Sequence, residues 1–197
     1  MEVFCLLNNT NITNKFQIIS SKKDLLMQSL ITFFSNKTNL DKVIPIITGD
    51  SVISLRILDW FVTNFSKKKN VHYQNTFNDI IKNFIVYLDY KSQLKAYSKK
   101  QFDPFCRRER ITLIDYDGNE LITTVGQLNF FRWALENDII NYIVENYQII
   151  ENDMNNSLRN LYKKKKGESN RRKRKELSIS ATKTVNKHNV SIIVQFD

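Results

Sequence analysis

Scarcity of glycine and proline is the sequence feature that most constrains the fold. Only four glycines and two prolines interrupt 197 residues, whereas asparagine, isoleucine and lysine are abundant throughout. Because glycine and proline often end helices and strands, so few of them favour long regular elements over a many-stranded barrel. A hydrophobic share of 42% is sufficient for a folded core. We therefore expect an α+β fold, with several helices packed on a small antiparallel sheet.

Two helices are predicted in the first third of the chain. Apolar residues at helical spacing predict the first over residues 22–35. The second is expected to begin at Asp50 or Ser51, whose side chains can cap the amides of the first turn. Three lysines, residues 67–69, suit its C-terminal end because cations are favourable there. Its apolar face is formed by Leu55, Leu58, Phe61 or Val62, and Phe65.

Residues 75–97 carry a mixed signal. FNDIIKNFI has helical spacing, whereas FIVYLDY has the β-branched and aromatic content typical of a strand. We interpret this segment as a helix that gives way to a strand near Phe84.

A β-hairpin followed by a helix is predicted next. Two alternating runs in residues 111–124 flank Asp117 and Gly118, a pair that supplies positive φ angles in tight turns. Thr124 and Gln127 then have the spacing of a reciprocal capping pair at a helix start. The apolar stripe of that helix continues to residue 143, with a break expected near Asn137.

The last third of the chain suggests a loop and a returning strand. Residues 1–162 are expected to form the globular α+β domain, and residues 163–176 a flexible basic loop. Residues 177–197 are expected to return and add a C-terminal strand, because NVSIIVQFD alternates apolar and polar residues.

The net charge of +10 is local. Counting Lys and Arg minus Asp and Glu gives +5 for residues 91–110, −6 for residues 111–162 and +7 for residues 163–176. Two basic blocks flanking an acidic segment favour a polyanionic partner that meets particular surfaces.

The first basic block interleaves cations with aromatic residues. Such a pattern suits a groove for single-stranded nucleic acid, in which cations hold phosphates and rings stack on bases. An equally weighted alternative is a solvated edge whose aromatic side chains point inward. Asp103 and Pro104 predict a turn in its middle, so both halves can present cations to one site. The candidate nucleic-acid-binding residues are Lys91, Lys95, Lys99, Lys100, Arg107, Arg108 and Arg110, with Tyr90, Tyr97, Phe102 and Phe105 between them.

The second basic block is the denser one. Its charges repel one another, so we expect the segment to stay disordered until an anion neutralises it. Phosphate contact without base specificity is favoured, and the alternatives are a nuclear import signal over Lys163–Lys175 and simple solubility. The candidate residues are Lys163, Lys164, Lys165, Lys166, Arg171, Arg172, Lys173, Arg174 and Lys175.

The sequence offers no pattern for a catalytic, metal or cofactor site. Two histidines, His72 and His188, match no metal-ligand spacing, and the four glycines form no phosphate-gripping loop. Cys106 beside two arginines can favour a thiolate, but a small buried hydrophobe is the preferred interpretation. Asp59 is expected to pair with Arg56 on one helix rather than to act as a base. We expect a protein that is not an enzyme and has no cofactor or metal.

No membrane partner is expected either. No window approaches the roughly 18 apolar residues of a spanning helix, and the N-terminal apolar run is too short for a signal peptide. Two cysteines without a disulfide pattern favour a reducing interior.

Several stretches together resemble a known group of proteins. They are SLRILDWFVTNFSKK, YKSQLKAYSKKQFDPFCRRERI, TTVGQLNFFRWALENDIINYI and ATKTVNKHNVSIIVQFD. Over roughly Ser51 to Asp197 they resemble an uncharacterised protein family of large nucleocytoplasmic DNA viruses, of the mimivirus and phycodnavirus kind. The resemblance implies a cytoplasmic viral factory or the virion as the setting, and it brings no catalytic motif.

Two functions are compatible with that setting. The favoured one is a non-enzymatic basic protein that binds DNA or RNA through phosphate contacts. The other is a minor capsid or virion scaffold protein whose basic loop contacts an acidic viral structural protein.

Overall fold

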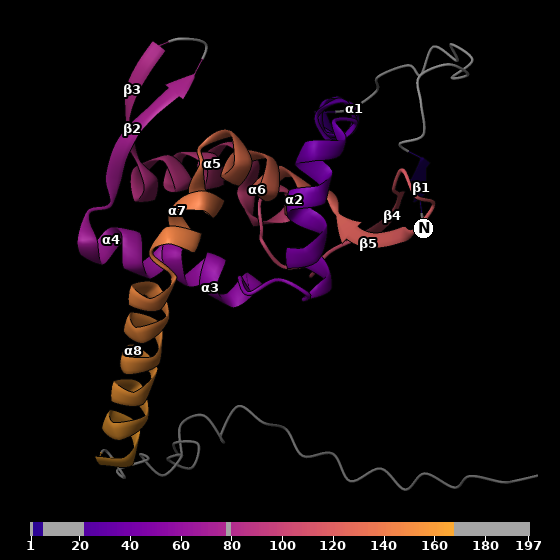
Figure 1. Ribbon diagram of the computed structural model, residues 1–197. Helices are drawn as coiled ribbons and strands as arrows, with labels where there is room; N and C mark the ends of the chain where they lie inside the picture. The colour runs from indigo at the N-terminus through magenta and orange to yellow at the C-terminus, as the bar shows by residue number, and fades with distance from the viewer. Residues whose placement is uncertain (1, 6–21, 78–79, 168–197) are drawn as a thin grey trace, which may run out of the picture. The chain divides into compact units, whose positions relative to one another are not determined.

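The computed structural model describes residues 2–5, 22–77 and 80–167 (Figure 1). The chain divides into two units, Met1–Ser157 and Leu158–Asp197, and residues 158–167 are the described part of the second. Helices and two small sheets confirm the predicted α+β class.

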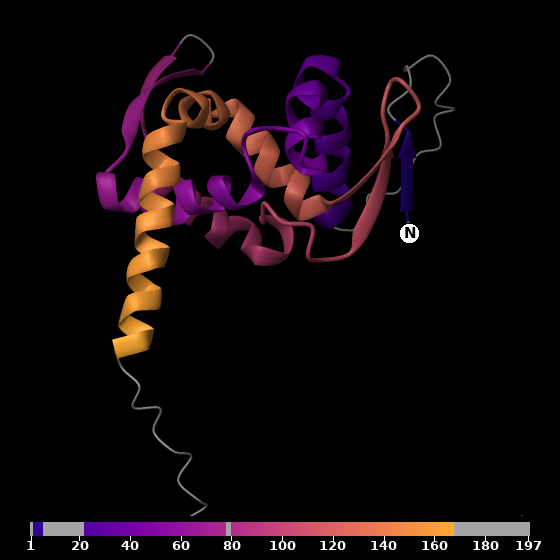
Figure 2. The ribbon, with the colours of Figure 1, turned by 60° about the horizontal axis from the view of Figure 1, so that its bottom comes forward.

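The helices supply most of the first unit. Figures 1 and 2 show α6 among α1, α5 and α7, and it contacts all three. The helical elements are α1 (Lys22–Phe34), α2 (Lys37–Thr48), α3 (Leu55–Trp60), a π-helical turn (Phe61–Phe65), α4 (Ser66–Lys69), α5 (Val86–Gln101), α6 (Val125–Glu136), α7 (Ile139–Glu145) and α8 (Tyr147–Gly167).

Five strands form two sheets among the described residues. In one sheet the order is β1-β4-β5, with β4 antiparallel to β5. β1 joins this sheet parallel to β4, so the sheet is mixed rather than purely antiparallel. The other sheet is the antiparallel pair of β2 and β3. The predicted C-terminal strand lies outside the described residues. The strands are β1 (Glu2–Cys5), β2 (His72–Phe77), β3 (Ile80–Ile85), β4 (Arg110–Ile114) and β5 (Glu120–Thr124).

The hairpin of β4 and β5 confirms the prediction for residues 111–124. Gly118 has φ 82°, although no positive φ occurs at Asp117. Asp115 holds the connecting loop, because its carboxylate accepts hydrogen bonds from the backbone N–H groups of Asp117 (2.9 Å) and Asn119 (2.7 Å). The Asn119 side chain donates to it as well, which holds the pKa of Asp115 below its usual value.

The interpretation of residues 75–97 is wrong in its order. The strands β2 and β3 come first and α5 follows, whereas a helix followed by a strand was expected. Tyr73 pairs with Phe84 across the hairpin, with ring centroids 5.4 Å apart. Val86 and Tyr90 are buried one helical turn apart, so FIVYLDY contains the start of a helix despite its strand-like composition.

The helix at residues 22–35 is confirmed, but the next one differs in detail. Ser54, rather than Asp50 or Ser51, caps α3 by accepting a hydrogen bond from the Ile57 amide. The π-helical turn explains why both Phe61 and Val62 are fully buried, because its wider turn brings both onto the core side. The sequence interpretation missed α2, where Pro45 interrupts the usual helix pattern.

An aromatic cluster joins α6 to α5 and β3. Trp133 is 4% exposed, and its ring lies 5.4 Å from Phe102 and 5.6 Å from Phe130 between centroids. Tyr90 and Phe84 lie against the same indole at 6.0 and 6.3 Å. Phe130, Phe131 and Trp133 are all buried, so these rings belong to the core.

Stability is expected to fall at high pH because of Tyr90. Burial, with the charges of Asp59 and Asp103, raises the pKa of Tyr90 to about 12 from an ordinary 10.0. The folded state therefore holds this proton more tightly than the unfolded state, so its contribution is complete below about pH 10 and is lost as the pH rises towards about 12. Urea unfolding between about pH 8 and about pH 11.5 should show this decline. It should be shallower in Tyr90→Phe, and an unchanged slope would contradict the assignment.

The described end of the chain alters the expected position of the basic loop. Helix α8 continues through Gly167, so Lys163–Lys166 belong to a helix and not to a loop that begins at residue 163. Lysine is a good helix former, which explains why the helix extends past residue 162. Residues 168–176 lie outside the described residues.

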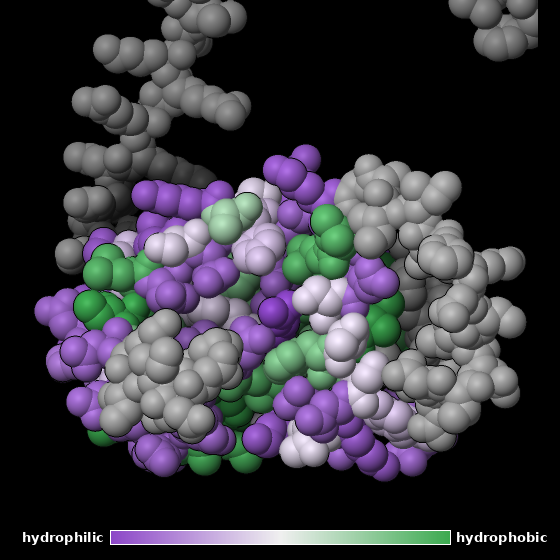
Figure 3. Space-filling model, turned by 90° about the horizontal axis from the view of Figure 1, so that it is seen from above, coloured by the Kyte–Doolittle hydropathy of each residue, from purple (hydrophilic) through white to green (hydrophobic). Residues whose placement is uncertain are grey.

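Exposed apolar side chains are dispersed. Figure 3 shows green residues in separate groups among purple ones on the face seen from above. In the described part of the chain, no helix has the length and apolar character needed to cross a membrane. The large exposed apolar side chains are Leu25, Val52, Ile85, Leu88, Ile122, Val144 and Ile149.

Candidate nucleic-acid interface

All seven cations of the first basic block are exposed. They come from three consecutive pieces of the chain: helix α5, the connection that follows it and the first residue of β4. Lys91 and Lys95 lie one turn apart on α5, so their side chains share a face. Among the described residues, Lys91, Lys95, Lys99, Lys100, Arg108 and Arg110 make no ion pair.

The seventh cation, Arg107, differs from the other six. Its guanidinium donates two hydrogen bonds to the buried Asp103 carboxylate, from Nε at 2.9 Å and from Nη2 at 2.8 Å. The same carboxylate accepts from the Phe105 amide at 3.3 Å. Arg107 therefore stabilises the turn after α5, and much of its charge is already balanced.

The aromatic residues of the block mostly point inward. Tyr90 and Phe102 are buried in the cluster around Trp133, so at these two residues the equally weighted alternative of inward-pointing rings is confirmed, and neither ring is open to stack on a base. Tyr97 and Phe105 are half-buried, and Phe105 lies under the Arg107 guanidinium at 4.8 Å. At this amphipathic edge the rings are wholly or partly buried, whereas the cations lie in solvent.

Asp59 does not form the predicted pair with Arg56. Arg56 is exposed, whereas Asp59 is half-buried, and among the described residues no ion pair joins them. Burial raises the pKa of Asp59, and the charge of Arg107 opposes that rise. Asp59 thus lies near the turn that holds Arg107 and Asp103, whereas Arg56 is exposed to solvent.

Buried amides of α6 position the connection between α5 and β4. Gln127 is fully buried and donates from Nε2 to the Pro104 carbonyl at 2.8 Å. Asn129 donates to the Gln101 carbonyl, also at 2.8 Å. The Thr124 hydroxyl caps α6 by accepting from the Gln127 amide, as predicted, but the Gln127 side chain serves this connection rather than completing the capping pair.

Close backbone contact at Gly126 reinforces this attachment. A Cβ atom at residue 126 would lie 3.0 Å from the Lys100 carbonyl oxygen, so a larger residue would require the neighbouring backbone to shift by a few tenths of an ångström. The Gly126 carbonyl also accepts a hydrogen bond from the Asp103 amide at 3.1 Å. Residues 100–103 are therefore fixed against the N-terminus of α6.

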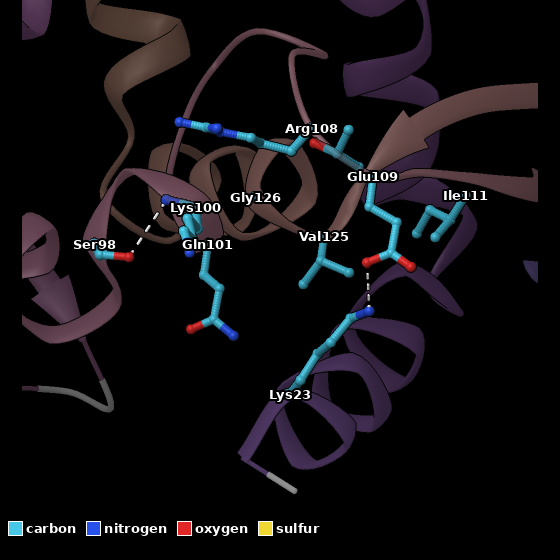
Figure 4. A pocket seen from close by; sticks show the side chains of 10 residues that line it. Lys23, Ser98, Lys100, Gln101, Arg108, Glu109, Ile111, Val125 and Gly126 are labelled. Atoms are coloured by element: carbon cyan, nitrogen blue, oxygen red, sulfur yellow. Dashed lines mark hydrogen bonds and ion pairs between the residues drawn. The ribbon is translucent and has the colours of Figure 1, made fainter. Parts of the chain in front are cut away.

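A cavity of about 490 Å³ lies at this junction (Figure 4). In the figure, Val125 lies between Lys100 and the ion pair that joins Lys23 to Glu109. The first residues of α6 form one part of its lining. The charged and large apolar side chains that line the cavity are Lys23, Lys100, Arg108, Glu109, Ile111 and Val125.

Of the four charged side chains around this cavity, two form an ion pair with each other and two do not. Lys23 Nζ lies 2.7 Å from Glu109 Oε2, an interaction that lowers the pKa of Glu109. Lys100 and Arg108 have no carboxylate partner among the described residues. The sequence interpretation missed Lys23, since no local pattern links it to Glu109, 86 positions away.

Backbone strain occurs beside Lys100. Ser98 has φ 58° and ψ 168°, a conformation that non-glycine residues rarely adopt. Its hydroxyl accepts a hydrogen bond from the Lys100 amide at 3.3 Å (Figure 4). This break in α5 sets the direction of the backbone at Lys100, which lines the cavity.

The second basic block is only partly described. Lys163–Lys166 occupy the last turns of α8 in the second unit. Arg171–Lys175 lie outside the described residues, so their role as phosphate contacts stays a prediction.

In the described part of the chain, few side chains suggest metal binding or thiol chemistry. It contains no group of three or more His, Cys, Asp or Glu residues that can hold a metal ion. Cys106 is a free, half-buried thiol.

Comparison with known proteins relates the chain to an uncharacterised viral protein and to a family of unknown function. A family model described as "Family of unknown function (DUF7197)" matches residues 7–196. "Uncharacterized protein L507" of Acanthamoeba polyphaga mimivirus is 36% identical over an alignment of 163 residues that covers 80% of this chain. The chain spans 63% of that relative's length. No solved structure matches the chain. The resemblance to an uncharacterised family of large DNA viruses is confirmed.

Proposed function

We propose a function for this chain, which belongs to the DUF7197 family of unknown function: it binds nucleic acid, without catalysis, through contacts with phosphate groups. The observation that carries the proposal is the set of six exposed cations between residues 91 and 110 that lack an ion pair among the described residues. Exposed lysine and arginine side chains that form no ion pair are the usual partners of a phosphate backbone.

The geometry of the block also supports a fixed interface. Helix α5 carries Lys91 and Lys95 on one face, and the amides of Gln127 and Asn129 hold the connection that follows it. The cations therefore have a rigid base, so little backbone entropy is lost when a strand binds. Because the rings of Tyr90 and Phe102 are buried, we expect weak discrimination between base sequences.

The first test is a salt titration of binding. The affinity of the full chain for single-stranded RNA, single-stranded DNA and duplex DNA is measured between about 50 and about 200 mM salt. Each phosphate contact contributes about 0.7 to 0.9 to the slope of log affinity against log salt. Six contacts predict a slope of roughly −4 to −5.

A slope near zero, or no binding to any of the three, would contradict the proposal. In that case the minor capsid or scaffold alternative gains weight, and the acidic protein partner becomes the next target. Equal slopes for strands of different base composition are the expected sign of contact with phosphates alone.

A further inference from the structure

The cavity at the N-terminus of α6 differs from the rest of the proposed interface. The other cations are spread over an exposed surface, whereas Lys100 and Arg108 share a concave site of about 490 Å³. A volume of this order suits a single small ligand. The site also has an apolar side, formed by Ile111 and Val125.

We infer that this cavity binds a terminal phosphate monoester of a nucleic-acid strand. A monoester carries nearly two negative charges at neutral pH, whereas each internal phosphodiester carries one. Lys100 and Arg108 supply two charges without a carboxylate partner among residues 2–5, 22–77 and 80–167. The cavity thus matches the extra charge that exists only at a phosphorylated end.

The start of α6 adds to this match. Val125 and Gly126, which line the cavity, are the first residues of a 12-residue helix. The first turn of a helix carries a partial positive charge because its backbone N–H groups have no helical acceptors. Here the Gln127 amide is already capped by the Thr124 hydroxyl, so the partial charge is the contribution of this helix end. Gly126 also packs tightly on the Lys100 backbone, since an added Cβ atom would lie 3.0 Å from the Lys100 carbonyl oxygen, and this contact keeps the helix end near the lysine.

The neighbouring groups define how the rest of the terminal nucleotide is held. Ile111 and Val125, 1% and 7% exposed, form the apolar wall of the cavity on the side where the sugar would lie. Glu109 would repel a phosphate, but its ion pair with Lys23 balances that charge and leaves Lys100 and Arg108 as the phosphate side. The strand would then leave the cavity along the cations of α5, so this inference rests on the proposed function.

The test compares strands that differ only at their ends. Short labelled strands with a phosphate at either end, or with hydroxyls at both, are titrated against the full chain. We expect about tenfold tighter binding when one end carries a phosphate. Arg108→Gln and Lys100→Gln should remove this preference. Lys91→Gln, outside the cavity, should weaken all the strands alike and leave their ratio unchanged.

Competition with adenosine monophosphate distinguishes a strand end from a free nucleotide. Weak competition supports the strand end, whereas affinity equal to that of the phosphorylated strand would overturn it in favour of a mononucleotide. Equal binding of phosphorylated and unphosphorylated strands, or a preference that survives Arg108→Gln, would also overturn the inference. Salt-dependent binding without an end preference would leave the proposed function intact, so the two failures are distinguishable.

Discussion

Replacing Lys91, Lys95 and Lys99 together with glutamine is expected to lower the affinity for single-stranded nucleic acid about 1,000-fold at about 50 mM salt. These lysines are exposed and have no ion pair among the described residues. Each phosphate contact contributes about 0.7 to 0.9 to the slope of log affinity against log salt. Lowering the salt from about 1 M to about 50 mM therefore raises the affinity about tenfold for each contact. The slope of log affinity against log salt should become shallower by about one per lysine.

A matched control separates local contact from net charge. Lys37, Lys42 and Lys69 are exposed lysines of α2 and α4, and replacing them with glutamine changes the net charge equally. This variant should lose far less affinity, because its lysines lie outside the proposed interface. An equal loss in both variants would mean that the whole charge of the protein, rather than the block at residues 91–110, attracts the strand. Far-UV circular dichroism checks that each variant is folded.

Local patterns in the sequence predicted the elements that depend on neighbours in the chain. The hairpin around Gly118 and the cap at Thr124 need only a few adjacent residues, and both are present. Residues 75–97 were misassigned because β-branched and aromatic residues occur in both β3 and the first turn of α5. There, burial at Val86 and Tyr90 decides the structure, and burial depends on distant partners such as Trp133.

The candidate site was predictable in composition but not in geometry. The cations of residues 91–110 were predicted as an exposed block, and they are exposed. Three features needed the fold: the Asp103 contact that balances Arg107, the attachment by Gln127, and the contribution of Lys23 to the cavity. Gln127 and Lys23 contact partners 23 and 86 positions away, and the Asp103–Arg107 pair, although only four residues apart, depends on the turn that buries Asp103. The sequence alone does not show whether a glutamine such as Gln127 is buried or exposed.

Trp133→Ala is expected to lower the free energy of unfolding by about 3–5 kcal/mol. The indole is 4% exposed and contacts the rings of Phe102, Phe130 and Tyr90. Its Nε1 also donates to the Asp89 carboxylate at 2.6 Å. The substitution therefore leaves a large cavity where α6 meets α5, and it removes the shorter of two hydrogen bonds to the half-buried Asp89 carboxylate, the other coming from Gln93. Urea unfolding followed by far-UV circular dichroism measures the loss.

Two variants assign the cause of that loss. Trp133→Phe keeps an aromatic ring and removes the hydrogen bond to Asp89, so a loss of about 1–2 kcal/mol is expected. Trp60→Ala removes the same side chain from a half-buried position, where Nε1 donates to Asp153 at 3.2 Å, and it should cost less than Trp133→Ala. If Trp60→Ala cost as much, the aromatic cluster would not be the main attachment of α6 to α5. Residues of α6 line the cavity and attach the connection that contains Arg108. Trp133→Ala should therefore also remove any preference for strands with phosphorylated ends.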